Sequence, residues 1–116
     1  MEDVTNDLTQ WGCNVEEALE RFGGDIELYL ECLKIFDKDK NFVDLGDLLQ
    51  TKKYEAAGDC VHALKGVTAN LSIGPLLEVI AIISEALKQG EYAKAVDNYK
   101  ILLNKKQIYG KIITGC

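Results

Sequence analysis

Proline, histidine and closely paired cysteines are scarce in this sequence. It has one proline and one histidine in 116 residues, and none of its four cysteines forms a C-x-x-C pair. A tetrahedral zinc site would therefore need scattered ligands, and we expect Cys13, Cys32, Cys60 and Cys116 to be free, mostly buried thiols. The opening "MEDVTNDLTQ" is acidic and polar, unlike a signal peptide. The longest apolar run, "VIAIIS", is far too short to span a bilayer. We expect a cytoplasmic protein with no membrane partner.

Clusters of basic residues are also missing. The net charge is −6, with 13 acids and 4 bases in residues 1–50 against 6 acids and 9 bases in residues 51–116. Because binding to a phosphate backbone needs clustered lysine and arginine, we expect no nucleic-acid partner. The composition is that of an ordinary globular chain, with 47% hydrophobic and 28% charged residues. We expect a single domain over residues 1–116 that exists as a monomer.

No alternating strand pattern occurs, and the apolar residues repeat with a helical period throughout. Asn14 and Asp25 are expected to cap two helices at their starts, and Pro75 suits the first turn of another. The predicted helices cover residues 15–22, 26–36, 42–50, 54–71, 76–88 and 92–107. The apolar stripe of the last one is expected to comprise Tyr92, Ala95, Val96, Tyr99, Leu102 and Leu103.

Four substantial helices with short connections predict an all-α fold. The expected architecture is an antiparallel up-and-down four-helix bundle with a short extra N-terminal helix. The final stretch "IYGKIITGC", residues 108–116, is expected to trail off as a loose end.

The single histidine, His62, lies in the helix predicted over residues 54–71. At about 100° per residue, one narrow stripe of that helix should face the core. That stripe consists of Ala57, Val61, Leu64, Thr68 and Leu71. His62 lies roughly 130° from the middle of the stripe, so we expect its imidazole at the surface.

The neighbours of His62 on its side of the helix are small or charged: Gly58, Asp59, Lys65, Gly66 and Ala69. A glycine inside a helix costs about 0.5–1 kcal/mol relative to alanine, and two of them flank the imidazole here. We expect a low surface around the ring that the backbone of another macromolecule can approach. Lys65 would place its ammonium beside an anion carried by the imidazole. The pattern is typical of a nucleophile that accepts a phosphoryl group from a protein donor.

Ordinary structural roles compete with this interpretation. A lone exposed histidine on a helix is most often a plain surface residue. Gly58 and Gly66 would equally suit a crossing between two helices, and Lys65 would equally be a solvated lysine. A nucleophilic pair of Cys60 and His62 is not expected, because residues two apart on a helix point in different directions. Cys60 is instead expected to be semi-buried.

The stretch "HALKGVTANLSIGPLLEVI", residues 62–80, closely resembles the signature of histidine-containing phosphotransfer (HPt) domains. In that family His-x-x-Lys-Gly precedes small residues and a Leu-Gly turn. Upstream, "VEEALERFGGDIELYLECLKIF" is similar to the family's opening, a short capped helix followed by Gly-Gly-Asp and a second helix. The resemblance covers residues 12–100, and the surrounding helical pattern makes the weak H-x-x-K-G motif specific.

The resemblance implies a four-helix bundle whose exposed histidine carries a phosphoryl group between receiver-domain aspartates, or from a kinase to one. His62 matches the phospho-acceptor, Lys65 the lysine that stabilises the phosphate, and Gly66 the glycine that leaves room for the receiver. The implied partners are response-regulator receiver domains and a hybrid histidine kinase. Mg²⁺ is expected on the receiver, and no cofactor on this chain.

Two positions depart from the family pattern. Members often place a glutamine on the next helix, bonded to the imidazole, whereas the matching residue here is the shorter Ser84. That contact is expected to be absent or mediated by water. Ser72 stands where the family usually has glycine after leucine, and Gly74 is expected to supply the turn instead.

The sequence holds no Gly-rich phosphate loop, no P-loop and no paired acidic metal site, so we expect no chemistry with ATP. The leading hypothesis is a phosphorelay intermediate. The alternative is a helical bundle that binds receivers without transferring phosphate, which the intact His62, Lys65 and Gly66 argue against. An N-terminal Met and the full bundle length favour a stand-alone protein over a domain of a larger kinase.

A docking face for the partner is expected to be apolar near His62 and polar at its rim. Gly58, Gly66 and Ala69 are candidates for this face. Leu45 and Leu49 on the preceding helix are further candidates unless they belong to the core.

Overall fold

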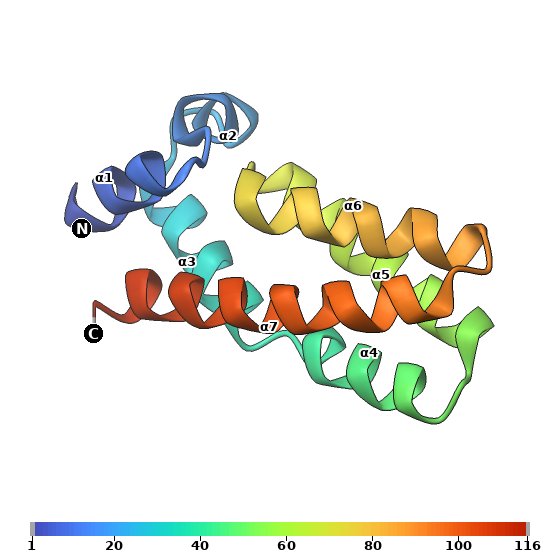
Figure 1. Ribbon diagram of the computed structural model, residues 1–116. Helices are drawn as coiled ribbons and strands as arrows, with labels where there is room; N and C mark the ends of the chain where they lie inside the picture. The colour runs from blue at the N-terminus through green and yellow to red at the C-terminus, as the bar shows by residue number, and fades with distance from the viewer. Residues whose placement is uncertain (1, 116) are drawn as a thin grey trace.

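The computed structural model describes residues 2–115, which form helices and no strand (Figure 1). In chain order the helices are α1 (Glu2–Trp11), α2 (Val15–Arg21), α3 (Ile26–Asp37), α4 (Asn41–Gln50), α5 (Tyr54–Asn70), α6 (Gly74–Lys88) and α7 (Tyr92–Thr114). The radius of gyration is 14.3 Å, close to the roughly 13 Å of a compact chain of this length. The all-α prediction is confirmed.

Polar caps begin the helices where the sequence predicts them. The Asn14 side chain accepts a hydrogen bond from the Glu17 amide at 3.1 Å, and the Asp25 side chain accepts one from the Leu28 amide at 3.0 Å. Each bond satisfies an amide that has no partner within its own helix. Pro75 lies in the first turn of α6, where a missing amide hydrogen costs nothing.

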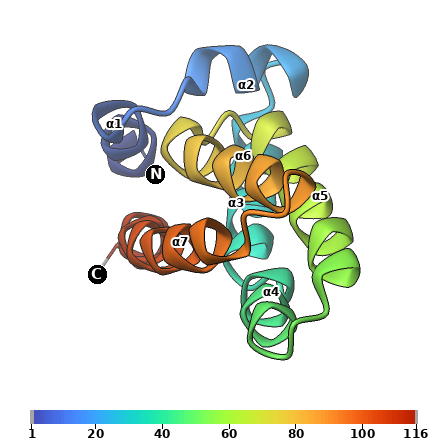
Figure 2. The same cartoon turned by 45° about the vertical axis from the view of Figure 1, so that its right-hand side comes forward.

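Helix α5 packs against α4 and α6, and α7 packs against α6, α4 and α3. In Figure 2, α6 lies above and α4 below, with α7 to the left and α5 to the right. The starts of α5 and α7 also meet at one end, where the rings of Tyr54 and Tyr92 stack with their centroids 3.6 Å apart. The histidine helix is thus held along its length by neighbours on both sides.

The expected loose end at residues 108–116 is wrong for the part that the structure describes, because α7 continues as a helix to Thr114. Tyr109 is fully buried, and its hydroxyl donates a hydrogen bond to the Leu33 carbonyl at 2.6 Å. Gly110 resembles a helix breaker in the sequence. A Cβ there would lie 3.2 Å from Asp37 Oδ1, so this glycine allows α3 and α7 to approach each other.

The predicted apolar stripe of α7 is also only partly correct. Ala95 and Leu102 are buried, whereas Val96 and Leu103 are 36% and 42% exposed. The buried face continues from Leu102 in a seven-residue step to Tyr109. The reason is that α7 has α6 on one side and α3 and α4 on another, which shifts its buried face away from the stripe that the sequence suggests.

Helix α1 was not predicted from the sequence, so two helices rather than one precede α3. Leu8 is the fully buried residue of α1, and Val4 and Trp11 pack partly against the core. Their spacing of four and three residues is the helical signal that was present. α1 contacts α2 and α7. Within residues 2–115, no helix combines the length and the apolar character needed to cross a membrane.

Candidate functional site

Helix α5 presents His62 to the solvent. The stripe expected to face the core is confirmed, since all five of its side chains are buried: Ala57, Val61, Leu64, Thr68 and Leu71. His62 lies on the opposite side of the helix and is exposed. No residue in the range 2–115 forms a hydrogen bond or an ion pair with its imidazole. Both ring nitrogens are therefore available to a molecule from outside.

The two glycines that flank His62 contact nothing. A Cβ at Gly58 or at Gly66 would find no atom within 4 Å beyond the adjoining helix backbone. The alternative that these glycines serve a helix crossing is therefore wrong. Gly46 in α4 shows what such a crossing looks like, because a Cβ there would lie 2.5 Å from the hydroxyl oxygen of Tyr99.

Lys65 and Ala69 lie at the edge of this open surface and are half-buried, while Asp59 is exposed. Within the described residues Lys65 has no ion-pair partner, so its ammonium is not neutralised by a carboxylate of the chain. The structure thus brings His62, Lys65, Gly58, Gly66 and Ala69 together on one side of α5. These are the residues that the helical spacing predicted.

Leu45 and Leu49 do not belong to this surface. Leu45 is fully buried and Leu49 is 4% exposed, so both are core residues and cannot contact a partner. The reason is that α4 turns this stripe inward against α5 and α7. Of the two alternatives left open for Leu45 and Leu49, the core is therefore correct and the docking face is wrong.

Two further residues are set apart from the imidazole. Ser84 is 5% exposed and forms no hydrogen bond with His62, as its short side chain suggests. Cys60 is buried, and its thiol donates to the Asn41 carbonyl at 3.3 Å. Burial, and then the nearby carboxylates of Asp44 and Asp39, raise the Cys60 pKa to about 11. Cys60 is therefore a protonated thiol directed at α4, not a partner of His62.

The turn after α5 is made by Ser72 and not by Gly74. Ser72 has a φ of 55°, in the left-handed region where glycine is favoured, which explains why a glycine at this position would suit the same turn. Gly74 begins α6 and has no positive φ. A Cβ on Gly74 would lie 2.9 Å from the Gly12 carbonyl oxygen, so this residue allows a close approach of two chain segments.

A clasp of hydrogen bonds holds the C-terminal end of α5. Arg21 Nη1 donates to the Asn70 carbonyl at 3.1 Å and to Ser72 Oγ at 2.7 Å, and Arg21 Nη2 donates to Glu17 Oε1 at 2.6 Å. The Ser72 hydroxyl donates to the same Glu17 oxygen at 3.0 Å. A cation at a helix C-terminus is stabilised by the unpaired carbonyls there. We call Arg21, Glu17 and Ser72 the clasp.

The clasp was not predicted from the sequence. Glu17 stands three residues after the cap Asn14, which is the capping-box position, but only the bond from the Glu17 amide to the Asn14 side chain forms. The Asn14 amide donates to the Ser72 carbonyl instead, so the Glu17 carboxylate is available to Arg21 and Ser72. Nothing in the local pattern signals this contact, because Glu17 and Ser72 are far apart in the chain.

The cysteines that the structure describes are free. Cys13 and Cys60 are buried and Cys32 is half-buried, as predicted, while Cys116 lies outside the described residues. Burial raises the pKa of the Cys13 thiol to about 12. In the described part of the chain, no three His, Cys, Asp or Glu side chains are grouped as a metal ion would require.

Comparisons with known proteins add nothing to this geometry. No protein-family model matches this chain, and neither a curated protein nor a solved structure matches it.

Proposed function

We propose that this chain is a histidine-containing phosphotransfer protein of a two-component phosphorelay. In this proposal α4, α5, α6 and α7 form an antiparallel up-and-down four-helix bundle. Support for the bundle comes from the contacts that run from α4 to α5, α5 to α6, α6 to α7 and back from α7 to α4. The protein acts in the cytoplasm as a monomer.

The observation that carries the proposal is the surface around His62. An exposed imidazole without an internal partner lies between two helical glycines that contact nothing. Each of these glycines costs the helix about 0.5–1 kcal/mol relative to alanine, and no packing contact inside the molecule compensates for it. The lower helix propensity of the two glycines is explained if a partner protein has to approach the imidazole closely.

The transfer step needs a neutral imidazole and a phosphorylated receiver aspartate. The lone pair of a ring nitrogen of His62 attacks phosphorus and forms a P–N bond as the P–O bond to the aspartate breaks. The electron pair of the broken bond returns to the aspartate, which leaves as a carboxylate. Lys65 stabilises the phosphoryl oxygens, and Mg²⁺ is bound by the receiver. The reverse step passes the group to a second receiver.

The positioning of His62 comes from the rest of the fold. The buried stripe of α5 sets which way the helix faces, and the clasp holds its C-terminal end. A nucleophile on a rigid helix needs little reorganisation before an in-line attack. This chain therefore supplies a positioned nucleophile, a cation and an accessible surface, while the receiver supplies the remaining catalytic groups.

A transfer assay tests the proposal. The protein and its His62→Gln variant are incubated with a phosphorylated receiver, or with phosphoramidate as a small donor, and are then weighed intact by mass spectrometry. We expect one phosphoryl group on the protein, labile in acid and stable in base, and none on His62→Gln. If a phosphorylated receiver binds the protein but no phosphate moves, the chain is a receiver-binding adaptor and the transfer function is wrong.

A further inference from the structure

A second surface feature lies where α4 meets α7. Gly46 of α4 lies against the ring of Tyr99 in α7, and this contact fixes how the two helices face each other. Val43 precedes Gly46 by three residues and therefore lies on the same side of α4. Val96 and Leu103 lie three and four residues from Tyr99 and share its side of α7. Figure 2 shows α7 and α5 on opposite sides of the molecule, so this feature is separate from the histidine surface. We call Val43, Val96 and Leu103 the apolar strip.

The apolar strip is not covered by the rest of the described chain. Val43 is 65% exposed, Leu103 42% and Val96 36%, although all three side chains are aliphatic. The contact beneath them is already complete, since the Tyr99 hydroxyl donates a hydrogen bond to the Phe42 carbonyl at 2.6 Å. Single exposed aliphatic residues are normal, whereas several around one helix contact mark an interaction site.

The apolar strip leads into two hollows at the C-terminal end of α7. Gly110 comes seven residues after Leu103, which places it on the same side of the helix. It lines a hollow of about 430 Å³ together with Lys111 and Thr114. A second hollow, of about 330 Å³, shares Thr114 and Asp37 with the first and extends along α3. The apolar strip and the hollows therefore lie in line along α7.

The side chains that line the hollows carry a surplus of positive charge. They include four lysines and one acidic residue, Asp37, whose Oδ1 is 2.6 Å from the Lys106 ammonium. The other three, Lys34, Lys38 and Lys111, have no ion-pair partner within residues 2–115. The carbonyl ends of α3 and α7 attract cations, but each is equivalent to only about half a negative charge. The hollows therefore keep unbalanced positive charge in a chain whose net charge is −6.

The charges beside the apolar strip itself balance each other. The carboxylate of Asp47 lies near Tyr99, because its charge, after burial, is the next cause that raises the Tyr99 pKa. Lys100 follows Tyr99 in the chain and lies one turn after Val96, so its ammonium lies beside the strip as well. The positive surplus is thus confined to the hollows, which distinguishes the two ends of this surface.

We infer that the apolar strip and the hollows bind an acidic amphipathic helix of a partner protein. Apolar side chains of that helix cover Val43, Val96 and Leu103, and carboxylates near one of its ends pair with Lys38 and Lys111. An added strand would need a free sheet edge, and residues 2–115 contain no strand, so a helix laid along α4 and α7 is the mode of binding that this surface offers. The inference goes beyond phosphoryl transfer and does not depend on it.

A peptide-binding measurement on the full chain tests the inference. The probe is a fluorescent helical peptide of about 14 residues with leucine at i, i+4 and i+7 and glutamates at one end. A second peptide keeps the leucines and carries lysine in place of glutamate. We expect the glutamate peptide to bind at least about tenfold more tightly than the lysine peptide. This difference should disappear at about 1 M salt, where charges are screened within roughly 3 Å.

Matched variants locate the binding site. Leu103→Ser should weaken binding of the glutamate peptide about tenfold. Its control is Ile101→Ser, at a side chain 46% exposed on the same helix but roughly 160° away around the axis, which should leave binding unchanged. Lys111→Gln should weaken binding about two- to fivefold, as expected for one exposed ion pair, whereas Lys88→Gln at the end of α6 should not.

Three results would overturn the inference. The first is equal affinity for the two peptides, or no binding of either at about 1 mM. The second is an equal loss of binding in Leu103→Ser and Ile101→Ser. The third is a dimer of the chain alone, observed by sedimentation, that Leu103→Ser dissociates, because a second copy would then occupy the apolar strip. The probes carry no phosphate and the strip lies away from His62, so each of these results leaves the proposed transfer function standing.

Discussion

The outer face of α5 and the contacts that hold α5 in place use small residues in opposite ways. Around His62, Gly58 and Gly66 have empty space where a side chain would lie. At the crossing of α4 and α7, Gly46 lies against the Tyr99 ring, and between α3 and α7, Gly110 lies against Asp37. The interior glycines allow neighbouring helices to approach. The outer glycines lower the helix propensity of α5 and make no packing contact that compensates for it, which is the observation on which the proposed function rests.

The largest effect is expected at the interior crossing. In Gly46→Ala the new Cβ would lie 2.5 Å from Tyr99 Oη, so the ring must move and its hydrogen bond to the Phe42 carbonyl at 2.6 Å is lost. Overpacking of this kind costs about 1–3 kcal/mol, more than the gain in helix propensity. Urea unfolding of Gly46→Ala and of the wild type measures this loss of stability. If the variant is as stable as the wild type, Gly46 is not needed for the close approach of α4 and α7.

The clasp is expected to show the next largest effect. Ser72→Ala keeps the left-handed backbone and loses the hydrogen bonds with Arg21 and Glu17, so the free energy of unfolding should fall by about 1–2 kcal/mol. Ser72→Gly loses the same bonds but removes the backbone strain, which is worth roughly 1 kcal/mol. We therefore expect Ser72→Gly to be the more stable of the two variants by thermal unfolding. The reverse order would show that the turn is not strained.

On the outer face of α5, substitution of a glycine is expected to stabilise the protein instead of destabilising it. Gly58→Ala and Gly66→Ala should each raise the free energy of unfolding by about 0.5–1 kcal/mol, because alanine is the better helix former and its Cβ meets nothing. The two sites are two turns apart, so the gains should add in the double variant. Loss of stability in either single variant, measured by urea unfolding, would mean that the face is not open.

The smallest expected effect is the contribution of the Glu17 carboxylate to stability, which should be lost at acidic pH. Hydrogen bonds from Arg21 and Ser72 to the Glu17 carboxylate, and the charge of Arg21, lower the Glu17 pKa below its usual value of 4.5. A lowered folded-state pKa contributes stability that is present above the unfolded pKa and is lost as the pH falls through the folded one. The stability difference between wild type and Glu17→Gln should therefore shrink below about pH 4.5. The carboxylate is exposed, so the difference is small, and a constant difference down to pH 2 would contradict this account.

The exposed face of α5 around His62 could be predicted from the sequence, but the contacts that hold α5 in place could not. Helical spacing alone placed His62 opposite the buried stripe, because both lie on one regular helix. Gly110 falls in the stretch that was predicted to be a loose end, because its close contact with Asp37 of another helix leaves no local signal. Leu45 and Leu49 were left open between the docking face and the core for a similar reason. A periodic pattern identifies an apolar stripe and does not say which neighbour covers it.

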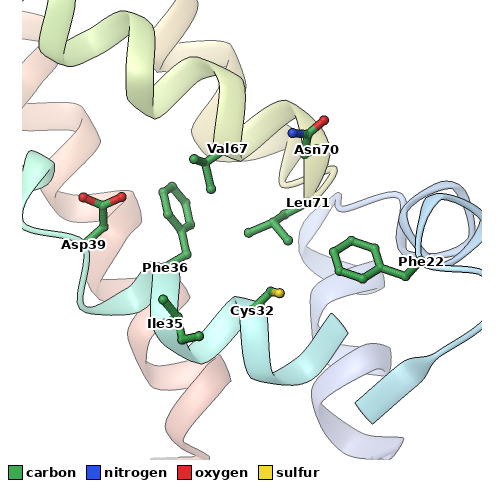
Figure 3. Close-up of a pocket in the computed structure, with 8 residues that line it drawn as sticks. All are labelled: Phe22, Cys32, Ile35, Phe36, Asp39, Val67, Asn70 and Leu71. Carbon is green, nitrogen blue, oxygen red and sulfur yellow. The ribbon is translucent and has the colours of Figure 1, made fainter. Parts of the chain in front are cut away.

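The apolar groove between α3 and the end of α5 (Figure 3) was not predicted from the sequence either. Ile35 and Val67, which line it, have no local feature that separates them from core residues, yet they are 65% and 38% exposed. The Ser72 turn shows the same limit at the level of the backbone. Ser72 has a left-handed φ, and its hydroxyl bonds to Arg21 and Glu17, which both come from α2 and could not be paired with it from the sequence.

The measurement that tests the central claim most directly is made on Gly66→Leu. A leucine on the open face should leave the fold at least as stable as the wild type, because nothing surrounds that position and leucine forms helices well. We expect its phosphorylation by a receiver to slow at least about tenfold, while phosphorylation by phosphoramidate, which needs no protein to approach the ring, stays at the wild-type rate. Equal rates with the receiver for Gly66→Leu and the wild type would contradict the claim that the glycines keep this surface clear for a partner.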